Sequence, residues 1–308
     1  DKLGFAIHVT LSSVNKAWRE HKGDHVIFCL EGRSWRKDFY KPYKANRSAA
    51  RAALTEQEAE EDRLFWQAFD DLKTFLLENT NCTVLQHPEL EADDLISGWI
   101  NNHPKDEHII ISSDSDFHQL LAENVKQFNG VADELYTING ILDRKGKLVI
   151  DKKTKQPKQI PDPKFILFEK CIRGDSTDNV FSAYPGVRTK GSKNKVGLIE
   201  AYADMNKKGY NWNNLMLQRW TDHNGIEHRV LDDYERNRTL IDLTAQPKEV
   251  KLKINECISK GILVKNKSMV GAKFLKFCGK YELNKLAEMA TSYSDFLNAG
   301  YPDEVSSQ

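Results

Sequence analysis

Two aspartates, Asp114 and Asp116, stand one residue apart directly after the apolar run 108–113. Two carboxylates this close repel each other, and burying them without a partner is costly. They therefore either cap a following helix or hold a positively charged ligand. The rest of the sequence has to decide between a structural cap and a binding site.

Other acids stand in equivalent places, after further apolar runs or in one later loop. Each cluster taken alone is explained about equally well as a helix cap, because acids are favoured at helix N-termini. Together they are harder to dismiss, because the carboxyl ends of parallel strands meet at one edge of a sheet. The predicted metal ligands are Glu31, Glu91, Asp93, Asp94, Asp114, Asp116, Asp175 and Asp178.

Oxygen donors without clustered His or Cys point to Mg²⁺ or Mn²⁺. Two such ions about 4 Å apart are a standard device for cleaving a phosphodiester. The nine histidines and five cysteines show no metal-ligand or disulfide spacing. We interpret the cysteines as reduced core thiols, which indicates an intracellular protein.

A basic stretch with interleaved aromatic residues follows Glu31. Residues 33–51 contain seven Lys or Arg and one acid, Asp38. Cations for phosphates and rings for bases are what a single-stranded nucleic acid needs, although a solvated basic loop is the simpler explanation. From this stretch we predict that Arg33, Arg36, Lys37 and Tyr43 bind nucleic acid.

A second phosphate-binding device is predicted at residues 178–202, where a Pro-Gly turn lies between two helical patterns. This arrangement suggests a helix-hairpin-helix whose backbone N–H groups grip a duplex phosphate. A Pro-Gly turn alone is weak evidence, since any turn can contain one. The predicted contacts are Gly186, Arg188, Lys190, Lys193 and Lys195.

Alternating strands and helices must position these side chains. The apolar runs 25–30, 82–86 and 108–113 predict buried strands, and 125–129 predicts an edge strand. Helical patterns cover 4–18 and 55–79, the latter opened by a Thr55–Glu58 capping box. The order predicts an α/β fold with a parallel-type twisted sheet flanked by helices.

The composition changes after about residue 140. A basic, proline-containing segment at 142–164 predicts an exposed hairpin and connector, and the chain beyond reads as mostly helical at 163–174, 195–208 and 231–243. We therefore expect a metal-dependent core over residues 1–160, with an arch at 33–55, and a helical DNA-binding region over 161–308.

The bulk composition limits the function classes. The 308 residues carry 45 basic and 45 acidic side chains, so the chain is not a uniformly basic nucleic-acid binder. No apolar run approaches the roughly 20 residues that span a membrane, and no signal peptide is visible. These features lead us to expect a cytoplasmic protein, in a host cell if phage-encoded.

The motifs "EADD", "SSDSDF", "GDSTDN" and "PGV", in this order, resemble the flap endonuclease and 5′-3′ exonuclease family. "YKANR" at 43–47 is similar to the arch base of its phage and bacterial members. The resemblance covers roughly 10–245 and is strongest to the 5′ nucleases called ribonuclease H in T-even-type phages. It implies a PIN-like nuclease core, a helical arch and a C-terminal region with the helix-hairpin-helix.

The resemblance also implies roles and partners. Lys44 and Arg47 match basic residues that steer and polarise the scissile phosphate, and the acids match family metal ligands. The implied activity is structure-specific 5′ cleavage that removes RNA primers or flaps during phage DNA replication. The implied partners are Mg²⁺ or Mn²⁺, K⁺ at the hairpin, flap DNA, RNA–DNA hybrids, a single-strand binding protein and a sliding clamp. A monomer is expected.

Three departures from the family pattern remain. The family's first strand, which ends in a metal-binding aspartate, is absent here, and Asp1 is a poor substitute, so we expect a truncated chain. Glu31 stands where the family usually has Asp, and Arg188 where Gly is common. Two alternatives stay open: a PIN-like ribonuclease, and a branched-DNA-binding module with an inactive site.

Overall fold

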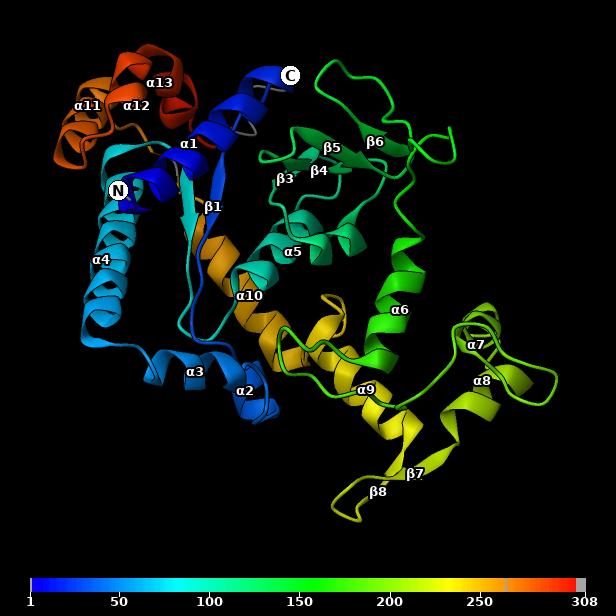
Figure 1. Ribbon diagram of the computed structural model, residues 1–308. Coiled ribbons are helices and arrows are strands. Elements are labelled where there is room, and N and C mark those ends of the chain that lie inside the picture. Colours follow the sequence, from blue (N-terminus) through cyan, green and yellow to red (C-terminus); the bar gives the residue numbers. More distant parts are fainter. Residues whose placement is uncertain (1, 264, 303–308) are drawn as a thin grey trace. The chain divides into compact units, whose positions relative to one another are not determined.

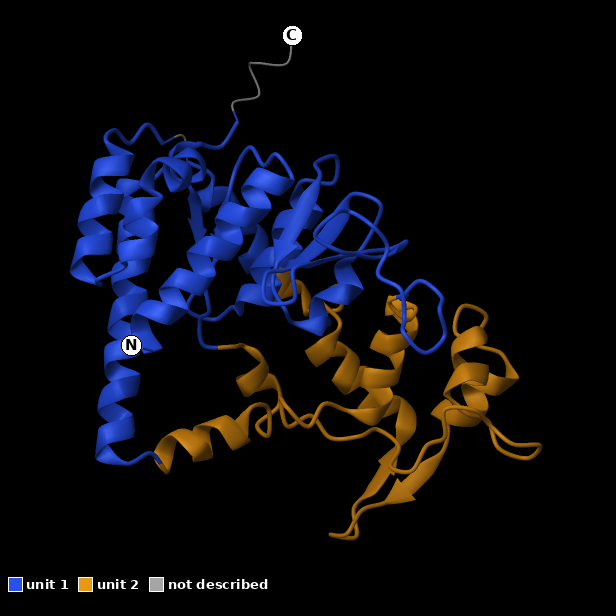
Figure 2. Ribbon diagram, turned by 45° about the horizontal axis from the view of Figure 1, so that its top comes forward, with its two compact units in different colours: residues 1–33, 54–159, 252–308 blue, residues 34–53, 160–251 orange. Residues whose placement is uncertain are grey.

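The structure is a computed structural model that describes residues 2–263 and 265–302, so Asp1 lies outside the described residues. The chain forms two compact units (Figure 2). Unit 1 comprises residues 1–33, 54–159 and 252–308, and unit 2 comprises residues 34–53 and 160–251. The division expected at residue 160 therefore differs in two segments: 34–53 belongs to unit 2, and 252–308 belongs to unit 1.

Unit 1 contains two small sheets surrounded by helices (Figure 1). Its helices are α1 (Lys2–Glu20), α4 (Glu56–Asn79), α5 (Ala92–Asn102), the 3₁₀ helix η1 (Ser115–Leu120), α11 (Val270–Lys280), α12 (Asn284–Glu288) and α13 (Ala290–Asn298). Its strands are β1 (Ile27–Cys29), β2 (Thr83–Leu85), β3 (His108–Ile111), β4 (Val125–Asn129), β5 (Glu134–Thr137) and β6 (Gly140–Leu142). Helix α10 (Lys248–Gly261) begins in unit 2 and continues into unit 1.

The sheet of unit 1 is divided and mixed, which corrects the expectation of one parallel sheet. β1 pairs with β2 in parallel, and β3–β4–β5–β6 form a second sheet in which only β3 and β4 are parallel. The predicted edge strand 125–129 is β4, and it lies inside this sheet, between β3 and β5. The prediction of an edge strand was wrong because β5 and β6, for which the sequence pattern predicts no strands, continue the sheet beyond β4.

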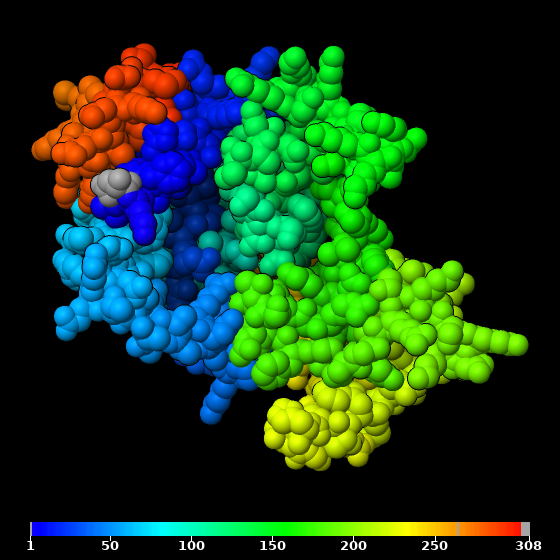
Figure 3. Space-filling model, in the orientation of Figure 1, coloured from blue at the N-terminus to red at the C-terminus, as the bar shows by residue number. Residues whose placement is uncertain are grey.

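A groove of about 590 Å³ separates the two sheets (Figure 3, the hollow between the blue and blue-green segments). Residues 25–30 of the β1 segment and 107–113 of the β3 segment both line it, together with side chains of α1 and α5. Among the described residues, β1 pairs only with β2, and β3 pairs only with β4. The groove therefore runs between strand segments that are each paired on one side.

The main core of unit 1 joins its N-terminal and C-terminal segments. Helix α4 begins as predicted, because Thr55 and Glu58 form the expected capping box. The apolar faces of α1 and α4 pack with α11 and α13 in one buried cluster. Its members include Ile7, Leu11, Leu72, Phe75, Leu76, Phe274, Phe277, Phe296 and Leu297. Helices α11, α12 and α13 thus contribute to the core of unit 1.

Unit 2 is mostly helical and has its own core. Its elements are α2 (Arg36–Phe39), α3 (Ala45–Ala52), α6 (Pro163–Arg173), α7 (Leu198–Ala203), α8 (Tyr210–Met216), β7 (Arg219–Thr221), β8 (Glu227–Arg229) and α9 (Val230–Ile241). Side chains of α6, α7, α8 and α9 pack in one cluster that includes Phe168 and Trp212. The helix predicted at 195–208 is shorter than expected, since α7 ends at Ala203.

Two further findings bear on the chain as a whole. All five cysteines are free, and three of them are buried, as expected of core thiols. No helix among the described residues is long and apolar enough to cross a membrane.

Candidate metal centre and nucleic-acid interface

The acids predicted for unit 1 follow strands β1, β2 and β3. Glu31 follows β1 closely, and its backbone carbonyl accepts a hydrogen bond from Nε2 of Gln86 at 2.8 Å. Glu91 and Asp93 come after β2, and Asp114 and Asp116 come after β3. Since β1 and β2 are parallel, Glu31 and the acids after β2 leave the same edge of their sheet.

At the start of α5, Glu91 is the N-cap residue and Asp94 forms a capping box with it. The Asp94 carboxylate accepts the Glu91 N–H at 3.0 Å, and both side chains are buried. Asp93 is half-buried on the first turn of α5. Burial and the charges of Cys257 and Asp93 raise the pKa of the Cys29 thiol to about 12, which indicates that Asp93 lies close to the end of β1.

The turn after β3 is fixed by backbone and side-chain hydrogen bonds. Oδ1 of Asp114 accepts the Asp116 N–H at 2.8 Å and so caps η1. Gln127, fully buried on β4, donates through Nε2 to the carbonyl oxygens of Ser112 at 2.9 Å and Asp114 at 2.8 Å. Sequence reasoning missed this role of Gln127, although a polar residue inside an apolar strand pattern could have indicated it.

The carboxylates also act on a neighbouring imidazole. Burial lowers the pKa of His118, and the negative charges of Asp114 and Asp116 only partly oppose this effect. His118 lies edge-on to Tyr136 with ring centroids 5.0 Å apart. The imidazole is therefore favoured in its neutral form beside the two aspartates.

In unit 2 the predicted arch base contacts the predicted acid loop. The Lys44 N–H donates to the Asp178 carbonyl at 2.8 Å, and the Arg47 guanidinium forms an ion pair with Oδ1 of Asp178 at 2.9 Å. Nδ2 of Asn179 donates to the Pro42 carbonyl at 2.7 Å. The segments 43–47 and 174–179 therefore contact each other through both backbone and side-chain atoms.

Two residues in this contact have left-handed backbone conformations. Lys44 has φ 53° and Asn179 has φ 57°. Such angles are uncommon outside glycine, although Asn adopts them more readily than most residues. Asn179 was not predicted as functional, but an Asn directly after an aspartate-rich turn is a signal that could have identified it.

Asp175 and Asp178 form a pair of neighbouring carboxylates. Their oxygens lie within 4.8 Å of each other, and both residues are half-buried. Nζ of Lys170 lies 3.0 Å from Oδ2 of Asp175. Burial raises the pKa of Asp175, but the hydrogen bond and charge of Lys170 and the backbone N–H of Thr177 outweigh it, so the net pKa is lowered. The ionised form of Asp175 is therefore favoured.

Two predicted nucleic-acid contacts are wrong. Arg36 is only 2 % exposed, and its Nε donates to the Leu240 carbonyl at 2.8 Å. Tyr43 is 5 % exposed and packs with Val180 and Leu240. Both side chains support unit 2 from inside, so neither presents its charge or ring to a ligand.

The remaining predicted contacts lie at or near the surface. Arg33 and the predicted residues of the 186–195 loop are exposed, and Lys37 is half-buried. Gly186 has φ 76°, as expected of a turn glycine. The Glu200 carboxylate accepts the N–H groups of Gly191 at 2.8 Å and Gly197 at 3.1 Å, which closes the loop around its lysines.

The donor set of both units consists of carboxylate oxygens. Such hard donors fit Mg²⁺ or Mn²⁺ better than softer metals. Divalent ions bound there would neutralise the clustered charge and stabilise negative charge on a phosphate. The exposed cations at 186–195 would hold the phosphates of a nucleic acid.

Comparison with known proteins agrees with this chemistry. Residues 4–146 match the family described as 5′-3′ exonuclease, N-terminal resolvase-like domain. The chain is 27% identical over 234 residues to DNA polymerase I of Rhizobium leguminosarum, a match that covers 75% of this chain and 19% of the relative. It is 29% identical to flap endonuclease Xni of Shewanella loihica, covering 68% of this chain and 73% of the relative. The chain spans about a fifth of the first polymerase relatives it matches.

A solved structure with a similar fold is the bacteriophage T5 D15 flap endonuclease in a pseudo-enzyme–product complex with DNA and metal ions. It has a TM-score of 0.53 and 20% identity, and the match covers 81% of this chain and 88% of that one. The likeness shows that the chain has the α/β, PIN-like nuclease fold. The matches together support a relationship of this chain to 5′-3′ exonucleases and flap endonucleases.

Proposed function

We propose that this chain is a divalent-metal-dependent 5′ nuclease that hydrolyses phosphodiesters as a 5′-3′ exonuclease and flap endonuclease. The observation that carries the proposal is that acids follow each of β1, β2 and β3 within one unit. Bound divalent cations would offset the mutual repulsion of these carboxylates. The curated relatives of the chain include 5′-3′ exonucleases and flap endonucleases beside DNA polymerases.

The acidic residues are proposed to bind the metal ions. In unit 1, Glu31, Glu91, Asp93, Asp114 and Asp116 are proposed to hold Mg²⁺ or Mn²⁺, with Asp94 acting mainly in the capping box of α5. In unit 2, Asp175 and Asp178 are proposed as further ligands. Metal ions at these positions would supply an activated water and a counter-charge for the leaving oxygen.

Basic residues of unit 2 are proposed to bind the substrate. Lys44 and Arg47 would orient the scissile phosphate, because the backbone of Lys44 and the side chain of Arg47 are both held by Asp178. The closed loop at 186–195 would grip duplex phosphates as a helix-hairpin-helix, with K⁺ bound to its carbonyls. Contacts to phosphates read shape rather than sequence, so the enzyme would act on branched DNA and RNA–DNA hybrids.

The finer role is proposed from the motif resemblance. The chain would remove RNA primers and flaps during phage DNA replication, as a monomer in the host-cell cytoplasm. A single-strand binding protein and a sliding clamp would be its partners there. The resemblance is to the ribonuclease H type of T-even phages.

Cleavage of a 5′-labelled flap tests the activity. Protein expressed from its full coding sequence is incubated with the flap in Mg²⁺, in chelator, and as Asp114→Asn. Asparagine keeps an oxygen that can accept the Asp116 N–H, so it removes the charge and not the cap. We expect junction-proximal, Mg²⁺-dependent cleavage that the substitution lowers by at least about 10²-fold.

Asp143→Asn is the matched control. Asp143 accepts the N–H of Lys145 at 2.8 Å in a similar turn of unit 1, but no predicted metal ligand adjoins it. Its substitution should leave cleavage unchanged. Tight flap binding without any cleavage would instead leave a DNA-binding module with an inactive site. Cleavage of single-stranded RNA in preference to flaps would favour a PIN-like ribonuclease.

A further inference from the structure

Helix α9 carries a buried asparagine that brackets the acid loop of unit 2. Asn237 is 0 % exposed, and its Nδ2 donates to the carbonyl oxygens of Cys171 and Phe181, both at 2.9 Å. Cys171 belongs to the last turn of α6, where carbonyls lack helical partners, and Phe181 follows the acid loop. A single amide therefore ties together both ends of the segment that contains Asp175 and Asp178.

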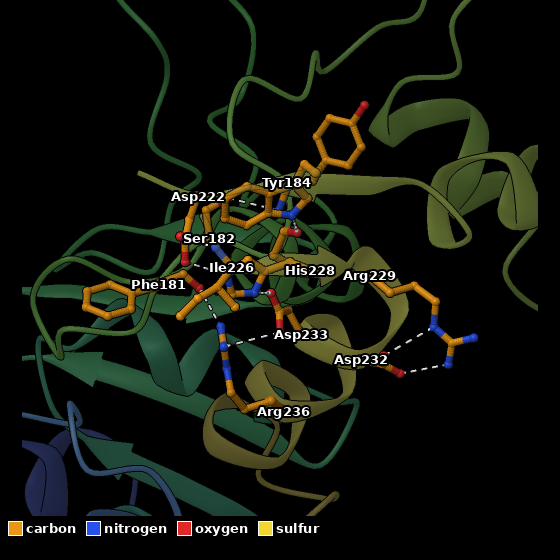
Figure 4. Close-up of polar contacts among 12 residues, drawn as sticks. Phe181, Ser182, Tyr184, Asp222, Ile226, His228, Arg229, Asp232, Asp233 and Arg236 are labelled. Carbon is orange, nitrogen blue, oxygen red and sulfur yellow. Dashed lines mark hydrogen bonds and ion pairs between the residues drawn. The ribbon is translucent and has the colours of Figure 1, made fainter. Parts of the chain in front are cut away.

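Arg236, the residue before Asn237, reinforces the same attachment. Its guanidinium donates to the Phe181 carbonyl at 3.1 Å and to Oδ1 of Asp233 at 3.3 Å (Figure 4). Its Nε donates to Oδ1 of Asn237 at 3.1 Å, which fixes the orientation of that amide. The guanidinium also lies 4.8 Å above the Tyr40 ring, next to the arch base.

The loop between the two attachment points is stiff. Asp175 and Val180 exchange backbone hydrogen bonds at 2.9 and 2.8 Å. Gly174 has φ 81°, and a Cβ there would lie 2.3 Å from the Val180 carbonyl oxygen. Because Val180 adjoins Phe181, a displacement of Phe181 is passed directly to Asp175.

We infer that Asn237 is a positioning residue that sets the separation of Asp175 and Asp178 and hence their affinity for a divalent ion, with Arg236 as its support. The inference rests on the proposed function in one respect, that this carboxylate pair holds a metal ion. Burying an amide without its hydrogen bonds is costly, so the side chain of Asn237 stays bonded to the carbonyls of Cys171 and Phe181. Groups that orient metal ligands typically change metal affinity when they are replaced.

Asn237→Ser tests the inference, and Asn213→Ser, at an exposed position, is the control. Asn213 also donates through Nδ2 to two carbonyls, those of Lys208 at 2.7 Å and Gly209 at 2.9 Å, but in a part of unit 2 without predicted ligands. We expect Asn237→Ser to raise the Mg²⁺ concentration for half-maximal flap cleavage by about 10–100-fold. Saturating Mg²⁺ should restore most of the rate, and Asn213→Ser should leave the midpoint unchanged.

Thermal unfolding and direct Mn²⁺ binding, measured by electron paramagnetic resonance, complete the test. A lower melting temperature with an unchanged metal midpoint would make Asn237 a purely structural residue and would overturn the inference. Arg236→Lys is a second variant that keeps the positive charge near the surface. It tests the inference even if Asn237→Ser does not fold. It should shift the midpoint in the same direction by a smaller factor.

Failure of the inference and failure of the proposed function are distinguishable. Wild-type cleavage with an unaltered metal midpoint in both variants rejects the inference and keeps the nuclease. A wild type that never cleaves but binds Mn²⁺, more weakly after Asn237→Ser, rejects the nuclease and keeps the inference. A wild type that neither cleaves nor binds Mn²⁺ rejects both.

Discussion

Arg36 and Lys37 are adjacent in the sequence, but their side chains lie in different environments. Arg36 is buried and donates to Leu240, whereas Lys37 is half-buried. We predict that Arg36→Met lowers the free energy of unfolding by about 2 kcal/mol, because a charge-assisted hydrogen bond is lost. Denaturant unfolding measures this change.

Lys37→Met should affect DNA binding and not stability. It should leave the free energy of unfolding nearly unchanged and reduce the slope of log DNA affinity against log salt by about 1, since one phosphate contact is lost. A reduced slope together with an unchanged free energy of unfolding for Arg36→Met would contradict this division of roles.

The chemistry of single residues was more predictable than their burial. The order of acids after strands is local, so the positions of Asp114 and Asp116 at a strand end followed from the sequence alone. The burial of Arg36 depends on Leu240, 204 positions away, and that of Tyr43 depends on Val180 and Leu240. No local pattern contains this information, so a basic and aromatic stretch looked uniformly exposed.

At the scale of elements, the β7–β8 hairpin is attached to α9 through an imidazole. His228 lies 2.8 Å from Asp222 and 2.9 Å from Asp233 through its two ring nitrogens, and its ring stacks on Trp220. The hydrogen bond to Asp222 is the main cause that raises the pKa of His228, with Asp233 adding to it and burial opposing it. The charged form is therefore favoured in the folded state.

The direction of the pH effect follows from this raised pKa. The stabilisation by His228 is fully present below its ordinary pKa of 6.5 and is lost as pH rises through the raised pKa of the folded state. We predict that His228→Gln lowers the melting temperature at pH 6 and that the difference from wild type shrinks by pH 9. His223→Gln, at the exposed tip of the hairpin, is the control. A difference that stays constant with pH would contradict the prediction.

Elements with strong local signals were predicted well. The apolar spacing and the Thr55 cap predicted α4 to within a residue, and the predicted helices at 4–18 and 231–243 match α1 and α9. The β7–β8 hairpin was missed, although Asn224 and Gly225 form a recognisable turn signal between its short strands. The strand at 125–129 was placed at an edge because its neighbour β5 lacks a clear apolar pattern.

At the scale of the whole molecule, the C-terminal helices complete the core of unit 1. Phe274 on α11 is 0 % exposed and packs with Phe75 of α4. We predict that Phe274→Ala lowers the free energy of unfolding by about 3–5 kcal/mol, the usual result of emptying a buried aromatic site. Its neighbour Leu275 is 47 % exposed, so Leu275→Ala should cost much less.

If both substitutions lowered the free energy of unfolding equally, residues 252–308 would not be part of the core of unit 1. A boundary near residue 160 could be predicted because the composition changes after about residue 140. The return of the chain to unit 1 could not, since a helix such as α11 has the same amphipathic pattern whichever partner its apolar face meets. Burial of that face against α1 and α4 is a long-range event.

The groove between the two sheets of unit 1 bears on the association of this chain with other molecules. Along it, the β1 and β3 segments offer strand edges whose other sides are already paired, in an apolar setting. Unpaired edges are templates for strands of other molecules. An extended segment of about four or five residues could bond to both edges at once, and in concentrated solution a neighbouring molecule supplies such segments. We expect strand pairing of this kind at the groove, and a strand that occupies the groove would block it there.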